Sequence, residues 1–465
     1  MNNQVTKVKI KSLKIFKPTI SKNSFNIIEE DNNNFDITNY QFFPILLNPD
    51  KSLWELANRY LLNKLKSYEL PNPRTLDTIA CDLKDFMNFC NEEEIDYLHI
   101  PRKLSNPIIK YKKNLLFKLH NNELSTNTIK RKLSSITCFY DWLIRHENIK
   151  FNFPLWTDSE SYISYSNDYG NKNYKKIKTK DINKISSTKN LSTYDNSIID
   201  YGRLHPLTKK EQIILIRILK ECNNDEMLLS FIIALSTGAR MQTVFTLRLK
   251  HFEREVTNSE TIVKIEIGYG THCDSKFSKR NILFFPVWLY KKIQIYIKSE
   301  KAIRRRNKSK HIFDNYSLQY LFLTSRGSPY YCAKDDKYKI IYPSPPSGEN
   351  IRMFINNTLK PKYAEQNLQF NFSFHDLRAT YGINLVDSYT PLLKEKKISL
   401  TQILNIVRER MGHSSLRTTE LYLNYKVKGK NIDEAQNNYE QFLRRLICQH
   451  FIGQKIYNLT NHFKT

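Results

Sequence analysis

The chain has 465 residues, of which 40% are hydrophobic, so it is long enough for two or three domains with cores of their own. Lysine and arginine number 73 against 46 aspartates and glutamates, and the formal net charge of +27 favours a polyanionic partner, most simply nucleic acid, although an AT-rich genome also enriches lysine. Seven scattered cysteines without a Cys-x-x-Cys pair argue against a disulfide framework and a zinc finger, and they favour a reducing, cytoplasmic setting associated with the nucleoid.

Residues 1–50 form an N-terminal extension that is polar and rich in asparagine, and the sequence does not indicate its role. Hydrophobic residues and lysines alternate from Lys7 to Ile15, a pattern typical of a basic strand rather than of a targeting helix. The longest apolar run in the chain, Met227 to Leu235, is much shorter than the roughly 20 residues that span a bilayer, so we expect no membrane partner.

Residues 51–150 are predicted to form a helical domain. Apolar residues recur at helical spacing from residue 76 to 90 and again from 129 to 143. Ser125 precedes the second run and is a suitable N-cap. Residues 151–205 then change character, because Ser, Asn, Asp, Tyr and Lys replace the large aliphatic residues. We interpret them as an exposed polar linker, longer than most connections inside a compact domain.

A second domain is predicted to begin near Leu207. Thr208 and Glu211 have the spacing of a capping box ahead of an apolar helical repeat. Two strands separated by a polar hairpin loop are expected at 261–267 and 280–285. An apolar helix is expected at 226–235. A Thr-Gly turn ends it, and a new helix that carries Arg240 follows the turn. Further helices are expected at 287–299, 348–359, 375–386, 399–411 and 415–425.

This order of elements predicts a mainly α fold with a small antiparallel β-sheet, in the α+β class. Residues 428–465 carry apolar positions at helical spacing, which predicts a C-terminal tail helix.

Two arginines stand in contexts that suit phosphate chemistry. A phosphodiester repels nucleophiles, so catalysis needs donors directed at the non-bridging oxygens of the transition state. Arginine stays charged and presents a planar fork of donors. Arg240 follows a Thr-Gly turn, and Arg378 closes a His-x-x-Arg motif that begins at His375. Each arginine alone is typical of a surface or salt-bridge residue, but their joint placement favours a pair of phosphate clamps.

Tyr422 closes a segment that begins at Met411 and reads Met-Gly-His-Ser-Ser-Leu-Arg-Thr-Thr-Glu-Leu-Tyr. A phenolic hydroxyl can attack phosphorus and leave a covalent, reversible bond once a base or cationic neighbours help it to ionise. His375 is suited to accept that proton, and His413 is suited to hydrogen-bond a phosphate oxygen. Most of the 28 tyrosines in the chain must serve packing or surface roles, and Tyr425 is the obvious competing candidate.

The departing oxygen of such a reaction needs a proton, which a lysine at a hairpin tip can deliver. Lys276 and Lys279 both lie in the predicted loop. Position favours Lys276 as the general acid, and either lysine can instead make an ordinary phosphate contact. No carboxylate cluster or histidine-rich spacing typical of metal sites occurs in the sequence, so we expect neither a metal nor another cofactor.

These residues, read in order, resemble the catalytic series of the tyrosine recombinases, the phage-integrase family. The Gly-His-Ser-Ser-x-x-Thr-Thr-x-x-Tyr segment is highly specific for that family. The series in this chain is Arg240, Lys276, His375 with Arg378, His413 and Tyr422.

The resemblance implies a catalytic domain over residues 206–427 and, more weakly, a helical core-binding domain over 51–150, which together form a C-shaped clamp on double-stranded DNA. It implies that the tyrosine joins the 3′ phosphate at a recombination site. Strand exchange would pass through a Holliday junction in a homotetramer, and the family pattern is compatible with accessory DNA-bending proteins. Basic residues that suit DNA contacts are Lys130, Arg131, Lys279 and Arg280, although a solvated basic face explains the first two equally well.

The chain departs from the family pattern at several places. Many members carry Glu or Asp three residues after the first arginine, where this chain has Thr243. The hairpin is longer than usual. Residues 300–345 and 387–398 look like insertions, and the three arginines at 304–306 suit either a backbone phosphate or a solvated loop.

Two other functional interpretations remain open. A type IB topoisomerase or telomere resolvase uses the same constellation of residues. A non-catalytic DNA-binding protein on a recombinase scaffold is the third interpretation, and Thr243 is the only sign of it.

Overall fold

The computed structural model describes residues 4–15, 19–21, 24–26, 38–66, 71–166, 172–185, 198–199, 203–257, 259–311, 313–342, 344–366, 372–413 and 419–422. The chain divides into two compact units, residues 1–190 and 191–465. Within the described ranges, no helix combines the length and the apolar character that crossing a bilayer requires. The expected tail helix over 428–465 lies outside the described residues.

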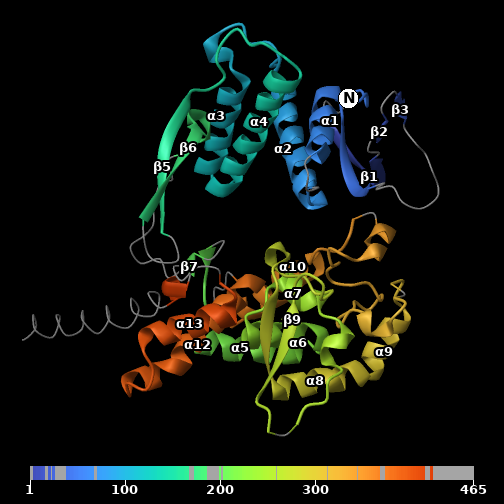
Figure 1. The fold of residues 1–465 in the computed structure, drawn as a ribbon, viewed down its shortest axis with the longest axis vertical. Coiled ribbons are helices and arrows are strands. Elements are labelled where there is room, and N and C mark those ends of the chain that lie inside the picture. Colours follow the sequence, from blue (N-terminus) through green and yellow to red (C-terminus); the bar gives the residue numbers. More distant parts are fainter. Residues whose placement is uncertain are drawn as a thin grey trace, which may run out of the picture. The chain divides into compact units, whose positions relative to one another are not determined.

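Four helices form the core of the first unit: α1 (Glu55–Asn63), α2 (Pro73–Glu92), α3 (Pro107–His120) and α4 (Thr126–His146). α2 and α3 both pack against α4 (Figure 1). The apolar residues at helical spacing face this shared core, where Leu83 and Leu133 are fully buried. Ser125 caps α4 as predicted, because its hydroxyl accepts a hydrogen bond from the backbone N–H of Thr128 at 3.2 Å. The helical prediction for this region is confirmed.

The N-terminal extension contributes to the same unit. β1 (Thr6–Ile15) is the predicted basic strand, and it pairs antiparallel with β4 (Thr38–Leu47). Lys7 Nζ lies 2.5 Å from Asp77 Oδ1 on α2, and Phe43 of β4 is buried in the core. Two shorter strands, β2 (Thr19–Ser21) and β3 (Ser24–Asn26), form a separate ribbon.

A β-hairpin occupies part of the predicted linker. β5 (Asp158–Ser166) pairs antiparallel with β6 (Lys172–Lys180), and Lys180 at its base forms an ion pair with Asp141 of α4. A two-stranded ribbon and an unstructured linker both consist mainly of exposed polar residues. Amino-acid composition alone therefore does not distinguish a ribbon from a linker. Short elements follow: a 3₁₀ turn at Asp181–Asn183 and strands β7 (Ile198–Ile199) and β8 (Arg203–Leu204).

Among its described residues, the second unit combines helices with two small antiparallel sheets, β7–β8 and β9–β10, which confirms the α+β class. β9 (Ile262–Ile267) and β10 (Asn281–Pro286) pair antiparallel, with Asn281 opposite Ile267. The capping box of Thr208 and Glu211 starts the first helix as predicted. The helices are α5 (Lys209–Glu221), α6 (Asp225–Thr237), α7 (Met241–Thr246), α8 (Val287–Lys298), α9 (Glu300–Asn307), α10 (Glu349–Phe354), α11 (Lys360–Ala364), α12 (Phe374–Lys394) and α13 (Leu400–Met411).

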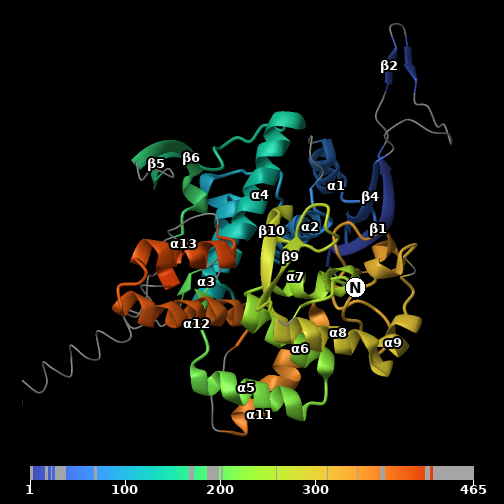
Figure 2. The ribbon, with the colours of Figure 1, turned by 60° about the horizontal axis from the view of Figure 1, so that its bottom comes forward.

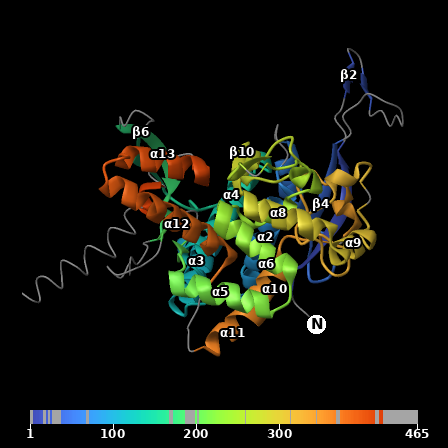
Figure 3. The same ribbon diagram turned by 90° about the horizontal axis from the view of Figure 1, so that it is seen from below.

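Three of these helices organise the region that concerns function. α12 packs along α6, and α13 packs on α12 (Figures 2 and 3). α12 is longer than predicted, because it continues through residues 387–394, which the sequence pattern suggested to be an inserted loop. A π-helical segment, Ile355–Leu359, joins α10 to α11, and residues 419–422 are helical.

Two of the three arginines at 304–306, Arg305 and Arg306, are held by contacts within the domain, whereas Arg304 is exposed. All three lie at the end of α9. Arg305 Nη1 is 3.0 Å from the buried carboxylate of Glu226 and also donates to Leu323 O. Arg306 is 7% exposed and donates to Ile297 O and to the hydroxyl of Tyr316. Two of the three guanidinium groups therefore hold this segment to the domain.

Candidate active site

A cavity of about 440 Å³ in the second unit is lined by residues around the turn from α6 to α7, the β9–β10 hairpin and the end of α13. Four of the six predicted catalytic residues line it: Arg240, Lys276, Arg378 and His413. The lysine and arginine residues in its wall are Arg240, Lys276, Lys279, Arg378, Arg408 and Arg410, and the one carboxylate is that of Glu409. Six cationic groups against one anionic group make the cavity attractive to an anion.

Arg240 reaches the wall through a tight turn at the end of α6. Gly238 ends that helix with φ of +67°, in the left-handed region that suits glycine. A Cβ on Gly238 would lie 2.5 Å from the ring of Tyr381 on α12, so the close approach of the turn to α12 also requires glycine. Arg240 is then the N-cap of α7, and no described residue forms a hydrogen bond or ion pair with its side chain.

Arg378 also lines the cavity and is buried, with 3% of its surface exposed. Its Nη1 donates to Gly238 O at 2.6 Å, and its Nη2 donates to Met411 O at 2.5 Å. These carbonyls lie at the C-terminal ends of α6 and α13, where the helix dipole favours a cation. Arg378 therefore links two helix ends and contributes a buried positive charge to the cavity.

His413 and Tyr422 lie side by side. His413 follows Gly412, which ends α13 with φ of +60°, and its Nδ1 shares a 3.1 Å hydrogen bond with the hydroxyl of Thr419. The ring centroids of His413 and Tyr422 are 5.5 Å apart. Tyr422 is fully buried and is not among the residues that line the cavity. The tyrosine thus lies behind the wall, in contact with a histidine that forms part of it.

His375 also lies outside the set of lining residues. It occupies the first turn of α12, three residues before Arg378, and is partly exposed. Residues three apart share a helix face, so the two side chains point to the same side of α12.

Both candidate lysines reach the cavity from the connection between β9 and β10. Lys276 is partly buried, with its Nζ 5.1 Å from the ring centroid of Phe277. Lys279 is more exposed and also lines the cavity. The geometry therefore keeps both residues as general-acid candidates. Arg280 does not line the cavity, and its Nε donates to Tyr269 O at 3.1 Å.

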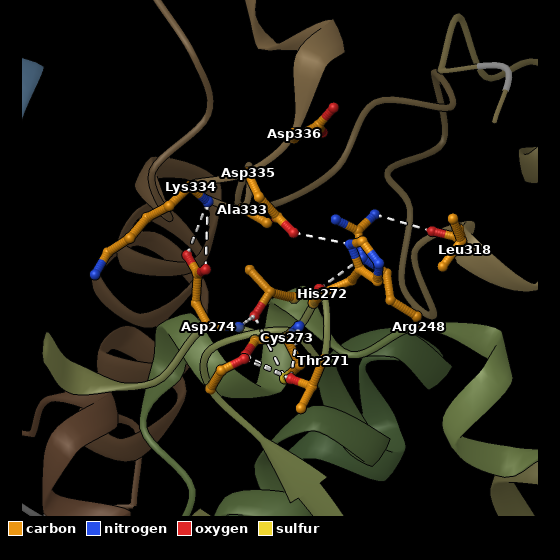
Figure 4. A network of polar contacts seen from close by, with 12 residues as sticks. Arg248, Thr271, His272, Cys273, Asp274, Leu318, Ala333, Lys334, Asp335 and Asp336 are labelled. Carbon is orange, nitrogen blue, oxygen red and sulfur yellow. Dashed lines mark hydrogen bonds and ion pairs between the residues drawn. The ribbon is translucent and has the colours of Figure 1, made fainter. Parts of the chain in front are cut away.

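A buried acid lies beside the lysine loop although residue 243 is threonine. Asp274 accepts hydrogen bonds from Gln242 Nε2 at 2.5 Å and from the backbone N–H of Lys334 at 3.1 Å, as Figure 4 shows for Lys334. Burial raises the pKa of the Asp274 carboxyl, and the hydrogen bonds to it oppose that effect. This carboxylate joins the lysine loop to both α7 and the 313–342 segment.

Arg408 and Arg410 line the cavity from the last turn of α13, and the sequence pattern did not predict them as site residues. Arg410 lies over the ring of Phe284, with its Cζ 3.9 Å from the centroid. Basic residues are common at helix C-termini, so the pattern alone does not distinguish these two from ordinary capping charges.

The two basic residues predicted on α4 differ in their contacts. Lys130 is exposed. Arg131 Nη1 donates to both carboxylate oxygens of the buried Asp82, at 2.6 and 2.5 Å, and Ser135 donates to the same carboxylate. Arg131 therefore has a structural partner within its own unit, whereas Lys130 is the more available of the two.

The described residues contain one group of candidate metal ligands that sequence spacing did not predict. His311, Cys332 and Asp336 are buried, with their ligand atoms within 4.8 Å of one another. Asp336 Oδ2 lies 3.1 Å from His311 Nδ1 and accepts a hydrogen bond from the Tyr320 hydroxyl. Burial opposes ionisation, but the hydrogen bonds from His311 and Tyr320 hold the pKa of Asp336 below its usual value. These contacts account for the cluster as a buried polar network.

No family model matches the sequence. Over 102 residues the chain is 32% identical to the tyrosine recombinase XerC of Leptospira interrogans serogroup Icterohaemorrhagiae, in serovars copenhageni and Lai. That match covers 22% of this chain and 30% of each relative. Over this segment the chain is therefore similar to tyrosine recombinases, in agreement with the ordered motif series. The chain matches less than a third of the length of these relatives.

Two solved structures are also similar to this chain. The Tn1549 transposon integrase in complex with transposon right end DNA shares 16% identity, with 80% of this chain and 93% of that chain covered and a TM-score of 0.43. A lambda integrase dimer bound to a COC′ core site shares 11% identity, with 80% and 94% covered and a TM-score of 0.42.

Proposed function

We propose that the chain is a site-specific DNA recombinase that breaks and rejoins DNA strands through a phosphotyrosyl intermediate on Tyr422. The observation that supports this most is the composition of the cavity. Arg240, Arg378 and His413 come from distant parts of the sequence and line one space together with Lys276. The phosphodiester of DNA is an anionic group that suits this set of donors.

In the proposed cleavage step, Arg240 and Arg378 donate hydrogen bonds to the non-bridging oxygens of the scissile phosphate. Tyr422 Oη forms a bond to phosphorus as the bond from phosphorus to the 5′ oxygen breaks. The phenolic proton passes to His375, and Lys276 delivers a proton to the departing oxygen. The products are a 3′-phosphotyrosyl bond and a free 5′ hydroxyl.

Rejoining reverses these transfers. A 5′ hydroxyl from the partner strand attacks the phosphotyrosyl phosphorus, its proton returns to the general acid, and Tyr422 leaves as the phenol. One ester replaces another in each step, so resealing requires no external energy source. Two successive exchanges at paired sites, through a Holliday junction in a homotetramer on double-stranded DNA, would complete recombination. Accessory DNA-bending proteins are compatible with this scheme.

The buried position of Tyr422 adds a condition to this proposal. Its ring must leave the packing against His413, and its hydroxyl must enter the cavity, before it can attack a phosphate held there. We therefore propose that DNA binding is accompanied by a shift of the segment that carries Tyr422.

A suicide substrate tests the proposal directly. The DNA on either side of the gene is first searched for direct repeats, and the substrate is a nicked duplex built on them, so that the short cleaved fragment diffuses away and the covalent adduct accumulates. The wild-type protein is expected to form an adduct that survives denaturing electrophoresis. Tyr422→Phe should bind the duplex with similar affinity and form no adduct, whereas Tyr425→Phe should form it normally. An adduct in the Tyr422→Phe protein would overturn the assignment of the nucleophile.

The same preparation separates the alternative functions. Relaxation of a supercoiled plasmid that lacks the repeats would favour a type IB topoisomerase. DNA binding by the wild-type protein without any adduct would favour a non-catalytic DNA-binding protein.

A further inference from the structure

Phe277 is an exposed aromatic ring at the edge of the cavity. It is 80% exposed, and among the described residues that line the cavity it is the one phenylalanine, tyrosine or tryptophan. The other side chains at this edge are polar or cationic, including the neighbouring Lys276 and Lys279. A large apolar ring held in water beside a phosphate-binding cavity calls for a physical explanation.

The backbone of Phe277 adds to that question. Its φ is +56°, and that of Ser278 is +55°. Both lie in the left-handed region, which glycine and asparagine adopt readily and a bulky residue such as phenylalanine rarely does. Strain of this kind persists where the surrounding structure holds the residue in place, and it is concentrated at functional sites.

Several contacts hold the loop in this conformation. The Ser275 hydroxyl donates to Lys279 O at 2.5 Å, and Lys334 Nζ donates to the Ser278 hydroxyl at 3.2 Å. Asp274 anchors the start of the loop through Gln242 and Lys334, and Figure 4 shows the Lys334 contact. The loop is therefore tethered on both sides of Phe277, and the ring is presented to the solvent on a supported backbone.

The chemistry around the ring indicates the partner. Lys276 Nζ lies 5.1 Å from the centroid of the Phe277 ring. A ligand that occupies both places must carry a phosphate for the cationic wall and an apolar, flat group for the ring. A nucleotide within a DNA strand has both parts, and aromatic side chains stack on bases or enter between base steps.

We propose that Phe277 stacks on the base of the nucleotide that carries the departing 5′ oxygen, and thereby positions that oxygen beside Lys276. This inference rests on the proposed recombinase function and on Lys276 as the general acid. Phe277 acts here as a substrate-positioning residue. An exposed aromatic ring on a strained backbone costs free energy, and stacking of the ring on a base offsets that cost.

Tryptophan fluorescence tests the contact without requiring cleavage. We place the reporter in the Tyr422→Phe protein, either as Phe277→Trp or as Tyr269→Trp. Tyr269 is the matched control because it belongs to the same hairpin, is 76% exposed and does not line the cavity. On titration with a mixed-sequence duplex at low salt, emission from the Phe277→Trp reporter should be quenched and protected from acrylamide. Emission from the Tyr269→Trp reporter should change little.

A kinetic experiment tests the positioning role on the nicked repeat substrate. Phe277→Asn removes the ring but suits a positive φ, so the loop keeps its conformation. We expect this variant to form the covalent adduct about tenfold more slowly, which corresponds to about 1.4 kcal/mol, with DNA affinity changed much less. Phe277→Trp should restore the rate, and Tyr269→Asn should leave it unchanged.

The outcomes separate this inference from the proposed function. Equal quenching at positions 277 and 269, or equal adduct rates for wild type and Phe277→Asn, would overturn the stacking inference and leave the recombinase proposal intact. A wild-type protein that binds DNA without forming an adduct would overturn the recombinase proposal, and with it the positioning role of Phe277. A protein that binds no DNA would overturn both.

Discussion

The ring of Tyr422 lies directly against Gly382 of α12. A Cβ on residue 382 would be 2.6 Å from Tyr422 Cε1 and 2.7 Å from Cδ1, closer than real side chains approach each other. Gly382 is four residues after Arg378, so the tyrosine ring lies one helical turn from a guanidinium that lines the cavity. The absence of a side chain at residue 382 is what allows the proposed nucleophile to be buried.

We expect Gly382→Ala to displace Tyr422 from its buried position. The added methyl group overlaps the ring, and overpacking of this kind costs about 1–3 kcal/mol of stability. Nitration of tyrosines followed by peptide mapping should show much stronger labelling of Tyr422 in the variant. Ser388→Ala, on an exposed position of the same helix, is the control. Unchanged labelling of Tyr422 in Gly382→Ala would contradict the packing described above.

The two arginines predicted to clamp the phosphate, Arg240 and Arg378, should respond differently to substitution. Arg240 has no partner among the described side chains, so Arg240→Ala should slow adduct formation by about 10²–10³ while the free energy of unfolding changes by less than about 0.5 kcal/mol. Arg378 donates to Gly238 O and Met411 O. Arg378→Ala should slow the reaction similarly and also destabilise the domain by about 1–3 kcal/mol, because two carbonyls lose their donor. Denaturant unfolding and single-turnover kinetics measure the two quantities. Equal stability of the two variants would contradict this distinction.

A substrate with sulfur in place of the departing 5′ oxygen should separate Lys276 from Lys279. A thiolate is a good leaving group without a proton, so it bypasses the general acid. We expect Lys276→Ala to cleave the normal substrate slowly and the sulfur substrate at nearly the wild-type rate. Lys279→Ala should change the cleavage rate, relative to the wild-type protein, by the same factor on both substrates. The reverse pattern would assign the general acid to Lys279.

His251 should make the second unit sensitive to acid. Burial lowers the pKa of this histidine to about 4, and the nearby charges of Lys250 and Arg248 act in the same direction. Its Nδ1 lies 3.0 Å from the backbone nitrogen of Arg248 and 3.1 Å from the carbonyl oxygen of Arg248, and the neutral ring bonds one of these two groups according to its tautomer. A depressed folded-state pKa contributes stability above the unfolded value near 6.5, and that stability is lost as the pH falls towards 4.

One unit of pKa shift corresponds to about 1.4 kcal/mol, so the loss is about 2 kcal/mol at pH 5 and approaches about 3 kcal/mol below pH 4. Urea unfolding at pH 7.5 and pH 5 should show it in the wild-type protein. His251→Asn, whose side-chain oxygen can still accept the Arg248 N–H, should show a smaller difference. His272→Asn, at an exposed position with φ of +60°, should keep the wild-type acid sensitivity.

Local patterns in the sequence were sufficient to predict most of the helices and the strands of the β9–β10 sheet. The apolar spacing predicted α2 and α4, and the capping residues Ser125 and Thr208 begin the helices that they were expected to begin. The strands on either side of the lysine loop agree with the prediction within one or two residues. These features depend on residues that are neighbours along the chain, so a reader of the sequence can recognise them.

Pairings between distant segments could not be read in the same way. The strand at Thr6–Ile15 was expected, but its partner β4 was not, because nothing local in the extension specifies which segment completes a two-stranded ribbon. The hairpin of β5 and β6 was interpreted as a linker for a related reason, since its exposed face has the composition of unstructured polar chain.

The sequence alone determined which chemistry we propose for this protein, because the order and spacing of its arginines, lysines, histidines and tyrosine form a specific series. Only the tertiary structure decided where those side chains lie, how buried they are and which groups they contact. It places Arg378 between two helix ends, adds Arg408 and Arg410 to the cavity wall, and buries Tyr422 against Gly382. The chemical identity of a reactive side chain depends on a single residue of the sequence. Its exposure and its contacts depend on packing among residues that are far apart in the chain.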